Sequence, residues 1–299
     1  MTNMRFTKLH GYGNDYIIIE AGQLAGADAL GEFVRRICHR HYGAGADGVA
    51  LIDKVSSDNA SDGESVLGDF AVRIFNPDGS EAAMSGNGTR CAAAYLYHQK
   101  LWSAEELRLA TRAGIKLYRL REQPGEGRYR FEAEIGKPLF DSASIPMLTG
   151  EPLPQVKNYP LAVGEGETVT ITALQMCNPN CCVLVEDFSA VDWRRLGSLI
   201  EPHRQFPERT NVEFIIVRDR QHIEARVWER GVGETLSSGT GACAAAVAAT
   251  LNDLTGRRVR VEMLGGLLEV EWRDDGEVLL TGTAEIIYTG EWRAEKVKG

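Results

Sequence analysis

The chain has 299 residues, of which 43% are hydrophobic and 25% charged, and its formal net charge is −9 at pH 7. This length is typical of two domains, and the composition is that of a globular protein with a large core. The negative charge argues against nucleic acid or an anionic membrane surface as the main partner.

Neither a membrane span nor a secretory leader is predicted. No run of about 18 apolar residues occurs, and residues 1–16 lack the apolar core of a signal peptide. We therefore expect a cytoplasmic protein, in which the six cysteines are free thiols. Cys177, Cys181 and Cys182 lie close together in the sequence. Because no histidine or second cysteine pair completes a zinc site with them, we expect no metal.

The first half of the chain is predicted to combine short strands with two helices. Residues 6–20 indicate two strands joined by a Gly-Tyr-Gly-Asn turn, with Asn14 at the start of the second strand. An apolar i, i+3, i+4, i+7, i+8 pattern predicts a helix over 30–38, ended by Gly43. The other predicted segments of this half are a strand at 49–52, a polar surface loop at 56–69, and strands at 70–75, 107–120 and 129–135.

A glycine-containing motif, Ser85-Gly86-Asn87-Gly88, opens the second helix of this half, which we expect to reach about Leu101. The residues after it are rich in alanine, a strong helix former. Glycines let a small ligand approach the backbone, and the N–H groups of a first helical turn attract anions. Taken alone the signal is weak, because serine before a helix is also the usual N-cap.

The second half repeats these ingredients after a proline-bearing passage from Lys137 to Pro160. Its Asn211-Val212-Glu213-Phe214-Ile215-Ile216 is similar to Asn14-Asp15-Tyr16-Ile17-Ile18, again with asparagine before a buried strand. An apolar face predicts a helix over 193–200. The predicted strands are 169–176, 182–185, 211–216, 223–228, 259–263, 267–272, 278–281 and 284–288.

A second copy of the glycine motif, Ser238-Gly239-Thr240-Gly241, precedes another alanine-rich segment. The match extends upstream, because Glu81 and Glu234 each lie four residues before the serine, and Arg73 and Arg226 each lie twelve before it. A duplicated strand–turn–helix unit explains this correspondence better than chance.

The elements predict an α+β fold of two pseudo-symmetric domains. Each would be a curved, mostly antiparallel sheet or barrel around a central helix, because both alanine-rich helices are apolar nearly all round. We expect one domain from residues 1–133 with 285–299, and the other from 134–284. Each domain would aim a helix N-terminus at a shared cleft.

The chain resembles the diaminopimelate epimerase family of cofactor-independent racemases and epimerases. The resemblance is carried by Lys8 to Tyr16, Gly45 to Gly48, Phe75 to Glu81, Gly86 to Cys91, Asn178-Pro179, Asn211-Val212, Glu229 to Leu236 and Gly239 to Gly241. It implies the interconversion of LL- and meso-diaminopimelate in lysine and cell-wall precursor biosynthesis, without pyridoxal phosphate or another cofactor. The implied partner is a small amino-acid substrate. The sequence leaves open whether the chain is a monomer or a homodimer.

The resemblance also implies a set of substrate-binding residues. A zwitterionic diacid needs many fixed donors, an acceptor for each ammonium group and a bidentate arginine. The residues at the family's binding positions meet these needs: Asn14, Asn76, Gly86, Asn87, Asn178, Asn211, Glu229, Arg230, Gly239 and Thr240.

The catalytic positions depart from the family pattern. The family uses two cysteines, one to remove the α-proton and one to return a proton on the opposite face, and here Ser85 and Ser238 occupy both places. Asn180 stands where the family has a histidine, while Glu229 remains as a carboxylate near Ser238. A serine hydroxyl is a far weaker acid than a thiol, whose pKa is about 8.5, and it needs an adjacent base.

Three interpretations follow from these departures. The chain could be an epimerase that uses Ser85 and Ser238, with Glu229 as one base. It could be a relative that binds an amino acid or small carboxylic acid without epimerising it, or that isomerises a different one, with both serines acting as N-caps. Deliberate replacement of two cysteines is the third interpretation, but it does not explain Asn180.

Overall fold

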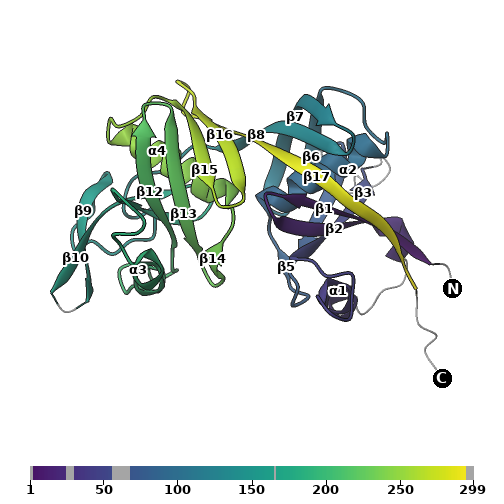
Figure 1. The fold of residues 1–299 in the computed structure, drawn as a ribbon, viewed down its shortest axis with the longest axis horizontal. Coiled ribbons are helices and arrows are strands. Elements are labelled where there is room, and N and C mark those ends of the chain that lie inside the picture. Colours follow the sequence, from purple (N-terminus) through teal and green to yellow (C-terminus); the bar gives the residue numbers. More distant parts are fainter. Residues whose placement is uncertain (1–2, 25–29, 56–67, 165, 294–299) are drawn as a thin grey trace, which may run out of the picture. The chain divides into compact units, whose positions relative to one another are not determined.

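The computed structural model describes residues 3–24, 30–55, 68–164 and 166–293. The chain divides into two compact units, Met1–Ala133 with Thr283–Gly299, and Glu134–Gly282 (Figure 1). Each unit places strands around one alanine-rich helix, which confirms the predicted α+β fold class. The polar segment predicted as a loop at 56–69 lies almost wholly outside the described residues.

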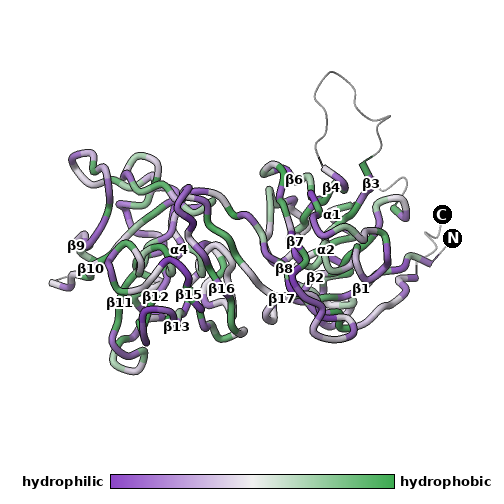
Figure 2. The backbone as a smooth tube through the Cα atoms, turned by 90° about the horizontal axis from the view of Figure 1, so that it is seen from above, coloured by the Kyte–Doolittle hydropathy of each residue, from purple (hydrophilic) through white to green (hydrophobic). Residues whose placement is uncertain are grey.

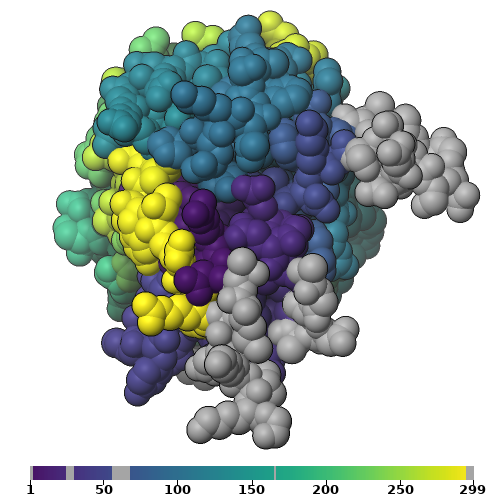
Figure 3. Space-filling model, turned by 90° about the vertical axis from the view of Figure 1, so that its right-hand side faces the viewer, coloured from purple at the N-terminus to yellow at the C-terminus, as the bar shows by residue number. Residues whose placement is uncertain are grey.

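Eight strands of the first unit form a closed ring. Each strand pairs with the next, and the last pairs with the first, in the order β1-β2-β3-β4-β6-β7-β8-β17. The β2–β3 and β4–β6 pairs are parallel, and the other pairs whose registers are resolved are antiparallel. Figure 3 shows the strand near the N-terminus and the strand near the C-terminus side by side on this unit, as their pairing requires. The bounds are β1 Met4–Gly11, β2 Asn14–Glu20, β3 Gly48–Lys54, β4 Phe70–Phe75, β6 Glu106–Thr111, β7 Gly114–Gly125, β8 Arg128–Gly136 and β17 Val278–Trp292, with the short β5, Glu81–Ala82, beside β4.

Helix α2, Gly86–His98, occupies the inside of this barrel and contacts β1, β2, β3, β4 and β6. Its run of alanines is fully buried, because only small side chains let a helix fit so closely inside a ring of strands. A shorter helix, α1, Leu30–Cys38, covers the outside, where Val34 and Ile37 pack against Ile17 and Val49 of the sheet. The short 3-10 helix Ala21–Leu24 leads from β2 toward α1.

The second unit has the same plan without a closed ring. Its strands run in the order β9-β10-β11-β12-β13-β15-β16-β17, with parallel pairs at β11–β12 and β13–β15. Helix α4, Gly239–Leu251, lies against the inner face, and α3, Trp193–Ile200, covers the outer face. Figure 2 shows hydrophobic residues along α2 and α4. The bounds are β9 Val156–Gly164, β10 Glu167–Gln175, β11 Pro179–Leu184, β12 Asn211–Asp219, β13 His222–Glu229, β14 Gly233–Thr235, β15 Arg258–Met263 and β16 Gly266–Trp272.

Several predicted boundaries were wrong for identifiable reasons. The helix predicted over 30–38 is α1, Leu30–Cys38, whereas the one predicted to reach Leu101 ends at His98. The segment predicted as one strand at 107–120 is a hairpin that turns at Gly114, whose φ of 87° is left-handed. Strand β9 was not predicted, because it lies in the proline-bearing passage. Among the described strands it pairs with β10, and Pro160 is tolerated there because an edge strand does not need every backbone N–H.

The repeat relates different strands from those suggested by the sequence. In chain order and pairing, β12 corresponds to β3, and β11 corresponds to β2. Asn211 therefore corresponds to Gly48, since Asn211 is paired with Asn180 as Gly48 is with Tyr16. Asn178 is the counterpart of Asn14, and each follows a residue with left-handed backbone, Cys177 and Gly13. The likeness of Asn211 to Asn14 is thus a local one.

Gly48 offers a test of the packing around α2. A Cβ at this residue would lie 2.6 Å from the backbone oxygen of Phe75 and 2.6 Å from Cε1 of Tyr16. We expect Gly48→Ala to lower the free energy of unfolding by about 1–3 kcal/mol, because the backbone must shift. Chemical denaturation would measure it. Gly22→Ala, where a Cβ has open space, is the matched control; equal losses in both variants would contradict the packing argument.

Candidate active site

Ser85 caps helix α2 in the first unit. It has an extended backbone, and its Oγ accepts a hydrogen bond from the N–H of Gly88 at 3.1 Å. The hydroxyl of Tyr16, on β2, donates to the same Oγ at 2.8 Å. Gly86 follows at the first turn, where helical N–H groups have no partner within the helix. The predicted capping role is confirmed.

A chain of amide side chains lies beside this helix start. The Nδ2 of Asn87 donates to Oδ1 of Asn14 at 3.1 Å, and Nδ2 of Asn14 donates to Asp47 at 2.9 Å. Arg90 donates to Oδ1 of Asn87 and, at 3.0 Å, to the carbonyl of Thr283. Asn87 is buried, so these bonds fix its orientation. The structure therefore joins two predicted binding residues, Asn14 and Asn87, in one network.

Asp15 anchors the strand that carries Asn14. Lys8 and Arg40 each lie 2.8 Å from its Oδ2. Burial alone would raise the pKa of Asp15, but the hydrogen bonds and charges of Arg40 and Lys8 outweigh it and lower the pKa to about 2. The carboxylate is thus firmly ionised and holds the start of β2 in place.

Ser238 caps helix α4 in the second unit in the same way. Its backbone is extended, and its Oγ accepts from the N–H of Gly241 at 3.2 Å. Ser238 is buried, with 7% of its surface exposed. Gly239 and Thr240 form the start of the helix and are partly exposed. Both serines are therefore N-caps, as the interpretation of the chain as a divergent relative predicts.

A second amide chain runs through this unit. Asn180 donates to the backbone oxygen of Asn178 at 2.6 Å, and Asn211 donates to Oδ1 of Asn180 at 3.3 Å. Oδ1 of Asn211 accepts from the backbone N–H of Arg230 at 2.9 Å. Asn180 thus acts as a link that holds two predicted binding residues, Asn178 and Asn211, in fixed positions.

Glu229 is the last residue of strand β13, and Arg230 begins the turn that follows. Burial raises the pKa of Glu229 above its ordinary value. The side chain of Arg230 is exposed and donates to the carbonyl of Glu208 at 2.9 Å. The following turn is held by Glu201, which accepts from the N–H of Gly231 at 3.0 Å. A partly buried carboxyl and an exposed guanidinium thus come from consecutive residues at the end of β13.

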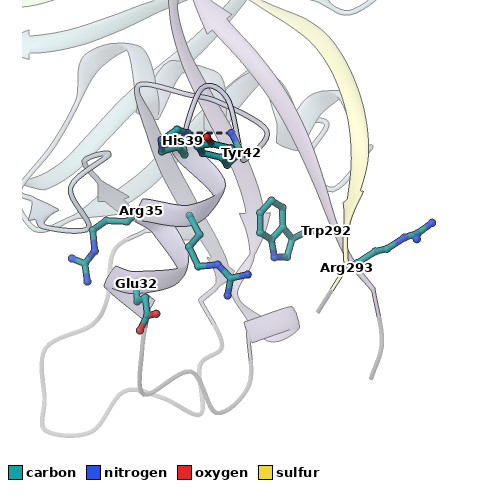
Figure 4. A pocket seen from close by; sticks show the side chains of 7 residues that line it. Glu32, Arg35, His39, Tyr42, Trp292 and Arg293 are labelled. Carbon is teal, nitrogen blue, oxygen red and sulfur yellow. Dashed lines mark hydrogen bonds between the residues drawn. The ribbon is translucent and has the colours of Figure 1, made fainter. Parts of the chain in front are cut away.

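Asn76 stands apart from these networks. It is exposed, and its Nδ2 donates to Ser80 within its own turn at 3.0 Å. A pocket of ≈ 740 Å³ in the first unit lies between α1 and the end of β17, and none of the residues that line it is a predicted site residue (Figure 4). The residues that Figure 4 labels around it are Glu32, Arg35, His39, Tyr42, Trp292 and Arg293.

The family model of diaminopimelate epimerase matches residues 6–138 and 172–287. The chain is 43% identical over 291 residues to the diaminopimelate epimerase of Pelotomaculum thermopropionicum, covering 97% of this chain and 99% of that one. It is 41% identical to that of Desulfitobacterium hafniense, covering 96% and 97%. The chain belongs to the diaminopimelate epimerase family. The resemblance inferred from the motifs is confirmed.

Solved structures agree with this fold. A phenazine biosynthesis protein of the PhzF family from Bacillus anthracis has a TM-score of 0.67 at 16% identity, covering 98% of this chain and 100% of that one. A hydroxyproline epimerase from Agrobacterium vitis, with bound trans-4-hydroxy-L-proline, has a TM-score of 0.66 at 15% identity, covering 99% and 94%. At such identities the likeness concerns the fold alone.

Two neighbours of the capping serines are not among the predicted site residues. Tyr16 lies in a predicted buried strand, and its hydroxyl donates to Ser85. Glu213 also lies in a predicted strand, and it is fully buried next to the first turn of α4. A carboxylate in the otherwise apolar Val212 to Ile216 segment was the available signal.

The ion pairs of Asp15 should make the free energy of unfolding depend on pH. Its pKa is lowered from 3.8 to about 2 on folding, so the stability it contributes is present above about pH 5 and is lost as pH falls toward 2. We expect Asp15→Asn to cost about 2 kcal/mol at pH 7, and the gap from the unmodified chain to close in acid. Denaturant titrations across this range would measure it.

The control for this series is Asp53→Asn, because Asp53 is an exposed carboxylate in the same unit. A gap that stays constant with pH would contradict the assignment of the lowered pKa to Asp15.

Proposed function

We propose that this chain interconverts LL- and meso-diaminopimelate by cofactor-independent transfer of the α-proton, in lysine and cell-wall precursor biosynthesis. The observation that carries the proposal is the pair of capped helix starts, Ser85-Gly86 and Ser238-Gly239, in a member of this family. Helix N-termini favour the negative charge that develops when the α-proton leaves.

In this proposal Ser85 and Ser238 act on opposite faces of the α-carbon, and Glu229 assists as a base. The raised pKa of Glu229 supports that role, because a carboxyl poised nearer neutrality exchanges protons more readily. The proposed substrate-binding residues are those that the resemblance implies: Asn14, Asn76, Gly86, Asn87, Asn178, Asn211, Glu229, Arg230, Gly239 and Thr240.

We place the enzyme in the cytoplasm, with domains of 1–133 plus 285–299 and of 134–284. No helix among the described residues is long and apolar enough to cross a membrane. A homodimer is part of the proposal and is tested by sedimentation equilibrium.

The alternative is a binding protein that does not epimerise its ligand. Its support is that each serine Oγ already accepts an N–H of its own helix, and that Asn180 is an amide rather than a base. In this case the same residues would hold an amino acid or a small carboxylic acid, or isomerise another one.

Deuterium exchange separates these functions. The chain is incubated with LL- or meso-diaminopimelate in D2O, and α-deuterium is followed by mass spectrometry or NMR. The epimerase predicts α-deuterium in both isomers. Measurable ligand binding without exchange at high protein concentration would refute the epimerase and support the binding protein.

Restoring thiols is the second test. We expect Ser85→Cys combined with Ser238→Cys to raise the exchange rate about 10²-fold or more, because a thiol ionises far more readily at neutral pH. Ser198→Cys, on the outer helix α3, controls for an added thiol. A fall in rate in the double variant would mean that the serines serve a different mechanism.

A further inference from the structure

Glu213 is an ionisable group in the interior of the second unit. On β12 its neighbours Val212 and Phe214 join the core that packs against α3, so Glu213 lies on the opposite face, toward α4. None of its surface is exposed. Its Oε2 accepts from the thiol of Cys182 on β11 at 3.7 Å, and its Oε1 has no partner among the described residues. A buried carboxyl oxygen without a partner is costly and calls for a role.

The unpartnered oxygen borders the cap of α4. A Cβ built on Gly241 would lie 3.1 Å from Oε1 of Glu213 and 3.1 Å from Oγ of Ser238. Both oxygens therefore line the same small space, which exists because residue 241 has no side chain. Gly241 is also the residue whose N–H bonds Ser238. The carboxyl is thus aimed at the first turn of the helix, beside the proposed catalytic hydroxyl.

The surroundings of Glu213 favour its neutral form. Burial raises its pKa well above the ordinary value, and the nearby carboxyl of Glu229 raises it further, against the bond from Cys182. The other titratable group near it is the buried thiol of Cys181. Burial and the carboxyl of Glu229 therefore both shift the pKa of Glu213 in the direction that favours its protonated form.

In the first unit a different side chain lies beside the equivalent glycine of the helix start. Gly88 corresponds to Gly241, and a Cβ there would lie 2.9 Å from Cε1 of Tyr16. The hydroxyl of Tyr16 donates to Ser85. Tyr16 comes from β2 and Glu213 from β12, which are not equivalent strands in the repeat. The two serines therefore have chemically different neighbours, a phenol that donates to Ser85 and a carboxyl that shares the space at Gly241 with Ser238.

We propose that Glu213 is a positioning residue that exchanges a proton with Ser238, whereas Tyr16 supplies Ser85 with a donated hydrogen bond. The inference deepens the proposed function and rests on it for its catalytic meaning. When Ser238 removes the α-proton, Oγ takes that proton and passes its own to the carboxylate of Glu213, while the electron pair of the C–H bond stays on the α-carbon. In the reverse direction Ser238 gives its proton to the α-carbon and regains one from the carboxyl of Glu213.

A thiol titration tests the pairing without substrate. Ser238→Cys introduces a thiol whose ionisation is followed by its ultraviolet absorbance, against the unmodified chain as background. The thiol and Glu213 should titrate as a coupled pair. We expect Glu213→Gln, made in that background, to lower the pKa of the introduced thiol by about one unit or more, because a second negative charge no longer opposes ionisation.

The matched experiment uses the other unit. In the Ser85→Cys background, Tyr16→Phe should raise the pKa of the introduced thiol by about one unit, since a donor to the thiolate is lost. Glu213→Gln should leave that thiol unchanged. The proposal would be overturned if Glu213→Gln left the pKa of the thiol at 238 unchanged. It would also be overturned if Glu213→Gln shifted the pKa values of the thiols at 85 and 238 equally.

Gly241→Ala gives a second route to the same answer, and it is used if Glu213→Gln folds poorly. The added methyl group enters the space between the two oxygens and should shift the midpoint of the introduced thiol at 238 toward that of the Glu213→Gln variant. An unchanged midpoint in a folded Gly241→Ala chain would also overturn the pairing.

Enzyme kinetics separates proton exchange by Glu213 from a purely structural role of this residue. If diaminopimelate exchange is observed, Glu213→Gln should lower kcat about 10²-fold with little change in KM and should remove one limb of the pH profile. Glu224→Gln, on the neighbouring β13, should leave both constants unchanged. Absence of exchange in the unmodified chain would refute the proposed function, while the thiol titration would still decide whether Glu213 and Ser238 are coupled.

Discussion

The N–H groups at the start of two enclosed helices are the constraint on which the structure depends. A first helical turn leaves several N–H groups without partners, and an enclosed helix cannot leave all of them to bulk water. Ser85 and Ser238 each satisfy one of these donors through the side chain. The remaining groups create a positive helix end that suits a carboxylate or a developing carbanion. The alanines and glycines follow from the same constraint, because larger side chains would hold the strands away from the helix.

Capping and proton transfer are compatible in one hydroxyl. A cap uses an acceptor lone pair of Oγ, so the O–H proton remains available to another group. The N–H that donates to Oγ also stabilises the oxygen when it is negative, as does the helix dipole. The weakness of serine as an acid then becomes the limiting factor, and neighbouring groups that accept or return its proton set the rate. On the proposed mechanism, the side chains packed against the caps therefore carry more of the chemistry than they would beside a thiol.

The sequence was sufficient for the plan of the fold because the information was local and repeated. Two Ser-Gly motifs before alanine-rich segments predicted the enclosed helices, and alternating apolar residues predicted most strands. The parallel pairs β2–β3 and β11–β12 were not predicted, because strands distant in the sequence leave no local pattern that shows which of them pair. These pairs decide that Asn211 corresponds to Gly48 rather than to Asn14. They also place Tyr16 and Glu213 beside the caps, which no spacing in the sequence indicates.

The duplication preserved the main chain of the helix start and changed the side chain beneath it. The caps have nearly the same backbone angles in both units, and each binds the N–H three residues on. Beneath them, one unit has a phenol from β2 and the other a carboxyl from β12. An epimerase needs one group loaded with a proton and one ready to accept, with the roles exchanged for the reverse reaction. Because a carboxyl can store a proton and a hydrogen-bond donor mainly stabilises charge, the proposed mechanism suits the two serines differently to accepting and to returning a proton, although both directions of inversion use both serines.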